Sequence, residues 1–346
     1  MSLFNLNSNP GPTRFSVMAH FQKSIKRIGV YCSGGDAPGM NAALRAVVRV
    51  AIAKGLEVYA IPSGYVGMIE GGFYQLSLRD MANIIQRGGT LIKTGRSAEF
   101  QKPEGRKKAV EQLQKHQIDA LVCIGGDGSF TGANLLWQEY QIPITGVPGT
   151  IDNDIFGTDN TVGFDTAVNT ALQAIDKIRD TAASHDRLFI VEVMGRNSGF
   201  IASHVGLAGG AEEIFTPDFN VTVEQAIDKI KAGIARGKTS SILITAEGQK
   251  PGRAYDLAEA IRKKAGFDAK VCILGHQQRG GSPTATDRIL ASRLGAAAVE
   301  SLLLGECDMM MGVAGESIVK VDFSTAVNTE KKTPGHYLKL ASILSQ

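Results

Sequence analysis

Short runs of apolar, often β-branched residues alternate along the chain with longer amphipathic stretches. The apolar runs have the length of single buried strands and are bounded by glycine or polar residues: 27–32, 57–62, 120–124, 143–147, 188–194, 240–245 and 270–274. Apolar residues recur at three- and four-residue spacing over 40–54, 167–180 and 222–236, which predicts helices. This alternation is typical of a doubly wound α/β fold, in which ligands bind at the carboxyl ends of parallel strands. We therefore expect functional residues directly after the predicted strands.

Composition narrows the classes of protein to consider. The chain has 346 residues, 43% of them apolar, which is enough for one large core or two moderate ones. The net charge is only +3 and the basic residues are spread along the chain, so neither nucleic acid nor a membrane is an expected partner. No apolar stretch approaches the length of a membrane span. Residues 1–24 lack a signal-peptide core and are predicted to form a flexible N-terminal extension.

The spacing of the cysteines indicates in which cellular compartment the protein works. They lie far apart and form no C-x-x-C pair: Cys32, Cys123, Cys272 and Cys307. This spacing favours neither a zinc site nor a disulfide framework, and it fits a reducing cytoplasm.

Two predicted strands end in similar glycine-rich turns, each followed by a predicted helix. The turns read CSGGDAPG at 32–39 and CIGGDGS at 123–129. Successive glycines permit positive φ and close approach, so backbone amides and the helix N-terminus can bind phosphate. Asp127 would repel that phosphate unless a cation lay between them, and Mg²⁺ held by carboxylates and phosphate oxygens supplies one. Glycines that merely cap strands are the alternative, and the second turn with its own acid favours the phosphate site.

The stretch VPGTIDND at 147–154 places two carboxylates after another predicted strand. On an extended chain Asp152 and Asp154 share one face while Asn153 points away. Beside Mg-bound phosphates, one carboxylate can take the proton of an attacking hydroxyl and the other can hold the metal or its water. An Asx-rich turn after Pro-Gly is the structural alternative, and these residues alone do not decide between the two.

Basic residues recur beside glycine or histidine at predicted strand ends. They are Arg96, Arg187, Arg196, Lys270 and Arg279, with His276 close by. Guanidinium groups match phosphate geometry, so together these residues favour a polyanion site, although each alone is commonly a solvated surface charge. His276 is interpreted as a hydroxyl or phosphate contact, and no His/Cys cluster indicates zinc.

The segments SGGDAPGMNAA, IGGDGS, PGTIDND, VEVMGR and LGHQQRGGSP, in this order, resemble the bacterial ATP-dependent 6-phosphofructokinases. The resemblance runs from about Lys26 to near the C-terminus. It implies the phosphofructokinase fold, in which two Rossmann-like doubly wound lobes are interleaved in sequence. Residues 25–163 and 276–325 would form the ATP-binding lobe, and 164–275 and 326–346 the sugar-phosphate and effector lobe. The implied reaction is glycolytic transfer of the γ-phosphoryl group of Mg-ATP to the 1-hydroxyl of fructose 6-phosphate.

The resemblance also assigns roles to residues. Asp152 would be the general base, with Thr150 and Arg196 at the transferring phosphoryl group, and Asp127 would bind Mg²⁺ with support from Asp154. ATP would be contacted by Gly35, Arg96, Ser97, Gly126, Asp127, Gly128 and Ser129. The sugar phosphate would be bound by Thr150, Ile151, Asp152, Arg187, Met194, Gly195, Arg196, Glu247, Lys270, His276 and Arg279. An effector, ADP or phosphoenolpyruvate in bacterial relatives, would be bound by Arg45, Arg49, Arg179, Glu212, Arg236 and Lys238.

The resemblance further implies a homotetramer with shared active sites. The sugar 6-phosphate would be gripped by Arg187, Lys270 and Arg279, two of which come from a neighbouring subunit in the family. Pyrophosphate-dependent members carry Asp and Lys where Gly128 and Gly149 stand, so ATP is the expected donor.

The chain departs from the family pattern at four positions. Lys270 replaces an arginine, which trades a bidentate fork for a point charge and would weaken sugar-phosphate binding. Ser97 and Gln101 replace phenylalanine and arginine near the adenine and ribose, so nucleotide preference stays open. Gly72 stands where one effector arginine is expected.

Three alternatives remain at this point. One is a pyrophosphate-dependent or other sugar-phosphate kinase of the same fold. Another is a dinucleotide oxidoreductase, against which GDGSFTG places its last glycine one residue late for the G-x-G-x-x-G fingerprint. The last is a non-catalytic sugar-phosphate or nucleotide sensor, against which Asp152 and Asp154 are both present.

Overall fold

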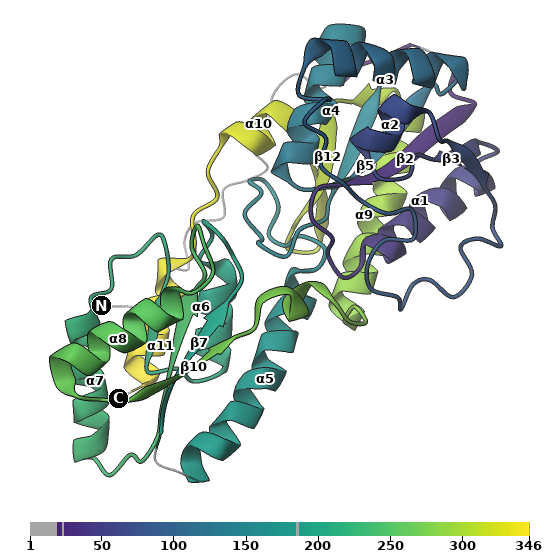
Figure 1. Cartoon of the computed structure of the whole chain (residues 1–346). Coiled ribbons are helices and arrows are strands. Elements are labelled where there is room, and N and C mark those ends of the chain that lie inside the picture. The colour runs from purple at the N-terminus through teal and green to yellow at the C-terminus, as the bar shows by residue number, and fades with distance from the viewer. Residues whose placement is uncertain (1–18, 23, 185–186, 346) are drawn as a thin grey trace.

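The computed structural model describes residues 19–22, 24–184 and 187–345, which form two α/β bodies (Figure 1). The larger body contains strands β2 (Arg27–Ser33), β3 (Glu57–Ala60), β4 (Tyr74–Leu76), β5 (Ala120–Gly125), β6 (Ile144–Pro148), β12 (Met309–Ala314) and β13 (Ser317–Asp322). They form one 7-stranded sheet in the order β13-β12-β6-β5-β2-β3-β4. Its inner strands pair in parallel, and only the edge strands β13 and β4 pair antiparallel.

The smaller body is built on a second sheet. Its strands are β7 (Leu188–Val193), β8 (Glu213–Phe215), β9 (Ser241–Ala246) and β10 (Ala269–Ile273). They form a 4-stranded sheet in the order β10-β7-β9-β8, parallel throughout. The predicted α/β fold with two doubly wound sheets is confirmed, and every predicted strand coincides with one of these strands.

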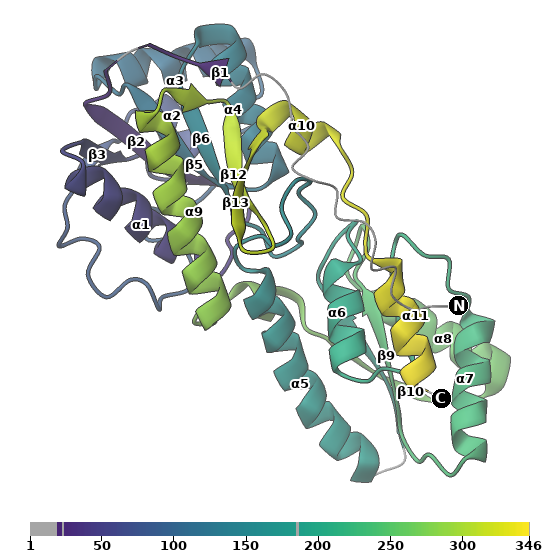
Figure 2. The ribbon, with the colours of Figure 1, turned by 180° about the vertical axis from the view of Figure 1, so that it is seen from behind.

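Helices cover both faces of each sheet. The larger body has α1 (Met40–Ala53), α2 (Tyr65–Glu70), α3 (Pro103–Lys115), α4 (Asp127–Tyr140), α9 (Ala285–Leu303) and α10 (Phe323–Asn328). Helices α1 and α9 pack on one face of its sheet and the others on the opposite face (Figure 2). The smaller body has α5 (Phe164–Ser184), α6 (Phe200–Ala208), α7 (Val223–Ala235), α8 (Arg253–Ala265), α11 (Gly335–Leu344) and the 3₁₀ turn η1 (Gly275–Arg279).

Burial on both faces explains why the strands could be recognised. All 6 residues of β5 are buried, as expected for a central parallel strand between two helix layers. The predicted helix at 222–236 is α7, and the Thr222 hydroxyl caps it by accepting from the Gln225 backbone N–H at 3.3 Å. Within the described part of the chain, no helix is long and apolar enough to cross a membrane.

The N-terminal extension is only partly described. Residues 1–18 and 23 of the predicted flexible segment 1–24 lie outside the described residues. Ala19–His20 forms strand β1, which pairs antiparallel with β11 (Glu306–Cys307). The start of the described chain is therefore fixed to the larger body by strand pairing.

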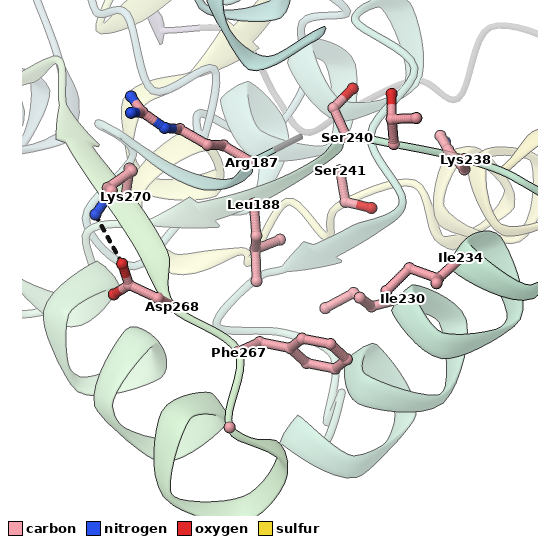
Figure 3. Close-up of a pocket in the computed structure, with 12 residues that line it drawn as sticks. Arg187, Leu188, Ile230, Ile234, Lys238, Ser240, Ser241, Phe267, Asp268 and Lys270 are labelled. Atoms are coloured by element: carbon pink, nitrogen blue, oxygen red, sulfur yellow. Dashed lines mark hydrogen bonds and ion pairs between the residues drawn. The ribbon is translucent and has the colours of Figure 1, made fainter. Parts of the chain in front are cut away.

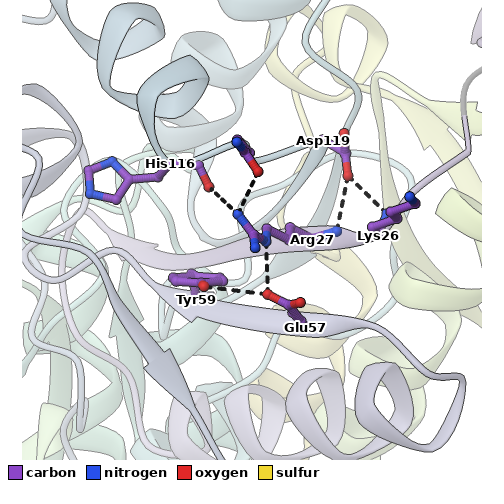
Figure 4. Close-up of polar contacts among 7 residues, drawn as sticks. Lys26, Arg27, Glu57, Tyr59, His116 and Asp119 are labelled. Carbon is purple, nitrogen blue, oxygen red and sulfur yellow. Dashed lines mark hydrogen bonds and ion pairs between the residues drawn. The ribbon is translucent and has the colours of Figure 1, made fainter.

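Polar residues at the amino ends of β2, β3 and β5 hold the strands together (Figure 4). Arg27 Nε donates to Glu57 Oε2 at 2.8 Å, and Arg27 Nη1 donates to Gln117 Oε1 at 2.9 Å. The Asp119 carboxylate accepts from the backbone N–H groups of Lys26 and Arg27 at 2.9 and 3.0 Å. At the amino end of the sheet, polar side chains are therefore hydrogen-bonded to one another and to the backbone. The glycine turns lie at the opposite, carboxyl end of the strands.

Candidate active site

The candidate residues converge where the carboxyl ends of the two sheets meet. Gly35, Asp127 and Asp152 follow β2, β5 and β6 of the larger body. Arg196 and Glu247 follow β7 and β9 of the smaller body. The charges of Arg196, Glu247 and Asp127 all act on the Asp152 carboxylate, so residues from both sheets share one site.

Asn153 shapes the loop that carries the two carboxylates. Its φ of 51° lies in the left-handed region, and its buried side chain donates to the Asp159 carbonyl at 3.1 Å. Its Oδ1 accepts from the Thr161 N–H at 3.0 Å. The prediction that Asp152 and Asp154 share a face of an extended chain was therefore wrong about the backbone, because Asn153 turns the chain. The two carboxylates nevertheless lie close enough for the charge of one to act on the other.

The Asp152 carboxylate is largely withdrawn from water. Its Oδ1 is buried, and no described group donates a hydrogen bond to it. Burial raises the pKa of Asp152, while the Arg279 and Arg196 guanidinium groups oppose that rise. A buried carboxylate oxygen that accepts no hydrogen bond has unused capacity to accept one or to take a proton, which is what a general base requires.

Asp154 and Asp127 line a cavity of about 330 Å³ together with Ser198 and residues 326–331. Asp154 is open to this cavity, but the surrounding protein strips much of its hydration and, with the charge of Asp152, raises its pKa to about 6. A cation among these carboxylates would remove their repulsion.

The carboxylates of Asp127 and Asp154 fit Mg²⁺ better than a metal that is held by protein side chains alone. Within the described chain, no three His, Cys, Asp or Glu side chains are grouped to hold a metal by themselves. Magnesium is typically held by one or two carboxylates plus substrate phosphate oxygens, which matches Asp127 with Asp154. These two residues would hold the ion beside the phosphates of a bound nucleotide.

The second glycine turn leaves room for a ligand. Gly126 precedes α4, and the Gly128 N–H donates to Asp127 Oδ1 at 2.6 Å. A Cβ added to Gly128 would meet nothing within 4 Å, whereas one on Gly149 would meet Met40 Cε at 2.8 Å. The preference for ATP over pyrophosphate requires open space beside the turn, and this space exists at Gly128. At Gly149 the lack of a side chain is explained by packing against Met40 in the core.

Tyr65 supports this turn from behind. Its hydroxyl donates to the Ser129 carbonyl at 2.6 Å and lies 3.0 Å from the Tyr31 hydroxyl. Its ring stacks on Phe100 with centroids 3.8 Å apart. Ser129 is only 3% exposed and its side chain packs against Gly125, behind the turn. Sequence reasoning missed Tyr65, since an aromatic residue within an apolar stretch gives no local signal of this contact.

The first glycine turn is contacted by two arginine-bearing segments. The Gly34 N–H donates to the Gly95 carbonyl at 3.3 Å, which brings the exposed Arg96 beside the turn. Arg279 Nη1 donates to the Asp36 carbonyl at 3.0 Å. The structure therefore places Arg279 between this turn and Asp152, at the centre of the site.

Three predicted ligand contacts have side chains that are already engaged. Ile151 is 0% exposed and Met194 is 6% exposed, both in the hydrophobic core. The Ser97 hydroxyl accepts from the Phe100 N–H at 3.1 Å. The buried Gln278, which sequence reasoning missed, accepts from the Met194 N–H at 2.7 Å and holds η1 against β7. Ile151 and Met194 can therefore contribute backbone atoms only.

The loop after β7 has an unusual backbone. Arg196 has a φ of 50° and Gly195 a φ of 136°, and such conformations persist only where surrounding structure holds them. Burial and the neighbouring Glu192 raise the pKa of Glu247, while the charge of His276 lowers it. The side chains of Arg196, Glu247 and His276 thus face one region of the site.

Arg187 and Lys270 lie at the other end of the smaller sheet (Figure 3). Strand β7 has 6 residues, which separates its two ends by roughly 17 Å at about 3.3 Å per residue. Both residues line a cavity of about 460 Å³, and Lys270 Nζ pairs with Asp268 Oδ2 at 2.7 Å. One chain therefore does not bring Arg187 and Lys270 to Asp152 and Arg279.

The predicted effector residues are also divided. The structure places some in the smaller body and the rest on α1 of the larger body: Arg179, Glu212, Arg236 and Lys238, and then Arg45 and Arg49. Lys238 forms an ion pair with the buried Glu212. Arg179 Nη2 donates to the Gly210 carbonyl at 3.2 Å. A single chain does not assemble these six residues into one pocket.

Comparison with known proteins gives consistent matches. The sequence profile of the family described as Phosphofructokinase matches residues 27–302. The ATP-dependent 6-phosphofructokinase 1 of Thermus thermophilus is 56% identical over 321 residues, which cover 93% of this chain and 100% of the relative. The enzyme of Cytophaga hutchinsonii named ATP-dependent 6-phosphofructokinase is 51% identical over 322 residues, covering 93% and 98%. The solved structure of phosphofructokinase from Saccharomyces cerevisiae aligns with a TM-score of 0.80 at 39% identity, covering 87% of this chain and 45% of that chain.

Proposed function

The chain belongs to the phosphofructokinase family, and we propose that Asp152 is the general base of its reaction. The activity is that of its full-length relatives, ATP-dependent phosphorylation of fructose 6-phosphate. The observation that carries the assignment is the buried Asp152 Oδ1, which has no hydrogen-bond donor in the described chain. The family match also sets aside the dinucleotide oxidoreductase alternative.

Each catalytic residue has one role in the phosphoryl transfer. The 1-hydroxyl oxygen of the sugar attacks the γ-phosphorus, its proton passes to Asp152, and the bond from the γ-phosphorus to the bridging oxygen breaks to release ADP. Arg196 stabilises charge that develops on the moving phosphoryl group. Asp127 and Asp154 would hold Mg²⁺, which when bound neutralises phosphate charge. Thr150 lies beside this point, where its Oγ1 accepts from the Asp152 N–H at 3.2 Å.

The nucleotide binds to the larger body and the sugar to the smaller body. The nucleotide phosphates lie on the two glycine turns, beside Arg96 and the open space at Gly128. The sugar lies against Glu247, His276 and Arg279 on the smaller-body side. This division places the transferring group between the bodies, next to Asp152.

The active site is completed by a second subunit of a homotetramer. This proposal is supported by the position of Arg187 and Lys270 at the far end of the smaller sheet, away from Asp152 and Arg279 of their own chain. The test mixes two inactive variants, Asp152→Asn and Arg187→Ala, and reassembles them. Hybrid assemblies regain roughly a quarter of the wild-type activity, because some sites then combine two intact halves. No regain of activity would mean that each site is formed by one chain.

Two further parts of the proposal concern the effector pocket and the cellular compartment of the enzyme. The effector residues divided between α1 and the smaller body fit a nucleotide or phosphoenolpyruvate pocket formed between subunits. The enzyme is placed in the cytoplasm, where its four free cysteines remain reduced.

One assay tests the proposed activity and its donor. Purified protein is given fructose 6-phosphate and magnesium, with ATP in one series and pyrophosphate in the other. Fructose 1,6-bisphosphate is expected with ATP only. Product with pyrophosphate would overturn the donor argument from Gly128, and absence of product in both series would overturn the proposed function.

A further inference from the structure

The chain crosses from the larger to the smaller body between α10 and α11, through residues 329–334 (Figure 2). Part of this crossing lines the cavity that also contains Asp127 and Asp154. Glu330 forms an isolated antiparallel β-bridge with Ile155, the residue that follows Asp154. The crossing therefore lies directly against the loop that carries the catalytic carboxylates.

Lys331 in this crossing contacts both bodies. Its Nζ donates to Asn153 Oδ1 at 3.0 Å and to the Asp159 carbonyl at 3.1 Å, both in the larger body. The same nitrogen lies 4.8 Å from the centroid of the Phe200 ring, at the start of α6 in the smaller body. One ammonium group thus joins the carboxylate loop to the first turn of a helix in the other body.

The burial of Lys331 removes water from its ammonium group, and this desolvation destabilises the charged form unless hydrogen bonds and nearby carboxylates compensate. Burial lowers the pKa of Lys331 to about 8, while the charges of Asp159 and Asp154 oppose that change. A partly buried cation is held by its hydrogen bonds, since leaving either partner unpaired would incur a desolvation penalty. The acceptors used by Lys331 are the same groups that set the shape of the loop: the Asn153 side chain and the Asp159 carbonyl.

We propose that Lys331 is a positioning residue for phosphoryl transfer. It fixes the left-handed turn at Asn153, the residue between Asp152 and Asp154, and it ties that turn to the smaller body. This inference rests on the proposed role of Asp152 as general base. A displacement of about 1 Å can lower a rate by roughly 10²-fold, so loss of Lys331 affects turnover more than substrate binding.

The test compares Lys331→Met, Lys331→Arg and the matched control Lys332→Met in the full-length enzyme. Lys332 is the neighbouring lysine on the same crossing and is exposed. We expect Lys331→Met to lower kcat by about 10- to 100-fold while both KM values stay within about threefold. Lys331→Arg restores most of the loss because it keeps the charge and donors, and Lys332→Met behaves as wild type.

Several outcomes would overturn the inference. They are a kcat for Lys331→Met within about twofold of wild type, a loss of affinity instead of turnover, or no rescue by arginine. An inactive wild-type enzyme would instead refute the proposed function itself. Should Lys331→Met not fold, as judged by circular dichroism, Lys331→Gln takes its place, because glutamine keeps an N–H donor but lacks the charge.

A double-mutant cycle with Asn153→Ala separates a shared role from two independent ones. If Lys331 acts through Asn153, the double variant turns over no more slowly than the slower single variant. Effects on kcat that multiply would contradict the proposed connection.

Discussion

Replacing Asp152 by asparagine removes the proposed proton acceptor and preserves the shape of the side chain. Burial raises the pKa of the Asp152 carboxyl, so at neutral pH the folded protein holds a charge that it disfavours. Because the pKa is higher in the folded state than in the unfolded chain, this cost is present above the folded pKa. It disappears below the unfolded value of about 3.9, where both states are protonated. We therefore expect Asp152→Asn to unfold at the same temperature as wild type or higher at neutral pH.

Activity should change in the opposite direction. Loss of a general base lowers turnover by roughly 10²–10⁴-fold, which corresponds to about 3–5 kcal/mol of transition-state stabilisation. Arg196 and Arg279, whose charges act on the Asp152 carboxylate and which we propose contact the substrates, remain in place. The KM for fructose 6-phosphate should therefore stay within about threefold of wild type.

The assay follows ADP release in parallel with thermal unfolding and calorimetric titration of fructose 6-phosphate. Asp80→Asn serves as the control, since the exposed Asp80 carboxylate accepts from the Ser77 hydroxyl and is not among the charges that act on Asp152. A kcat for Asp152→Asn within about fivefold of wild type would refute the reasoning. A loss of activity explained by unfolding at the assay temperature would refute it as well.

Three further predictions concern the same site. The value of kcat/KM should fall as the pH drops through about 6, because the pKa of Asp154 is raised to about 6 and this carboxyl is protonated below that pH. A profile that stays flat to about pH 5 would contradict this. Lys270→Arg should lower the KM for fructose 6-phosphate by roughly 3- to 10-fold through a bidentate contact, and an unchanged KM would place Lys270 outside the phosphate site. Gly128→Asp should raise the KM for ATP at least about 10-fold, since its carboxylate would enter the open space beside the turn and repel phosphate; unchanged ATP kinetics would show that the nucleotide lies elsewhere.

Much of the fold was predictable because central parallel strands are apolar on both faces. The run at 120–124 becomes β5, and its neighbours in the sheet show the same pattern. The hairpin of β12 and β13 was not predicted. Strand β12 begins with three methionines, whose intrinsic propensity favours helix, and its place is set by pairing with β6, far away in the sequence.

The carboxylates and glycine turns of the site were also predictable, since they directly follow apolar runs. Their supporting contacts were not, because those depend on distant segments. Gln278 reaches Met194 and the Ser198 hydroxyl donates to the Asp152 carbonyl at 2.7 Å, each across a long separation in sequence. The expectation that Asn153 turns away from the two carboxylates gave no sign that it is the buried residue around which the loop turns.

The basic residues show a different limit of sequence reasoning. Arg279 and Arg187 both lie near the ends of predicted strands and were assigned to the same sugar phosphate. Arg279 follows the carboxyl end of β10 and enters the site, whereas Arg187 precedes the amino end of β7. Which end of a parallel strand a residue occupies therefore decides whether it can serve the site of its own chain.

The most direct test of the central claim is to follow the phosphoryl group itself. Enzyme is incubated with fructose 6-phosphate, magnesium and ATP labelled at the γ-phosphorus, and the position of the label in the products is determined. We predict label on the 1-oxygen of fructose 1,6-bisphosphate with wild-type enzyme and almost none with Asp152→Asn. Label found only in inorganic phosphate, or equal transfer by Asp152→Asn, would contradict the mechanism.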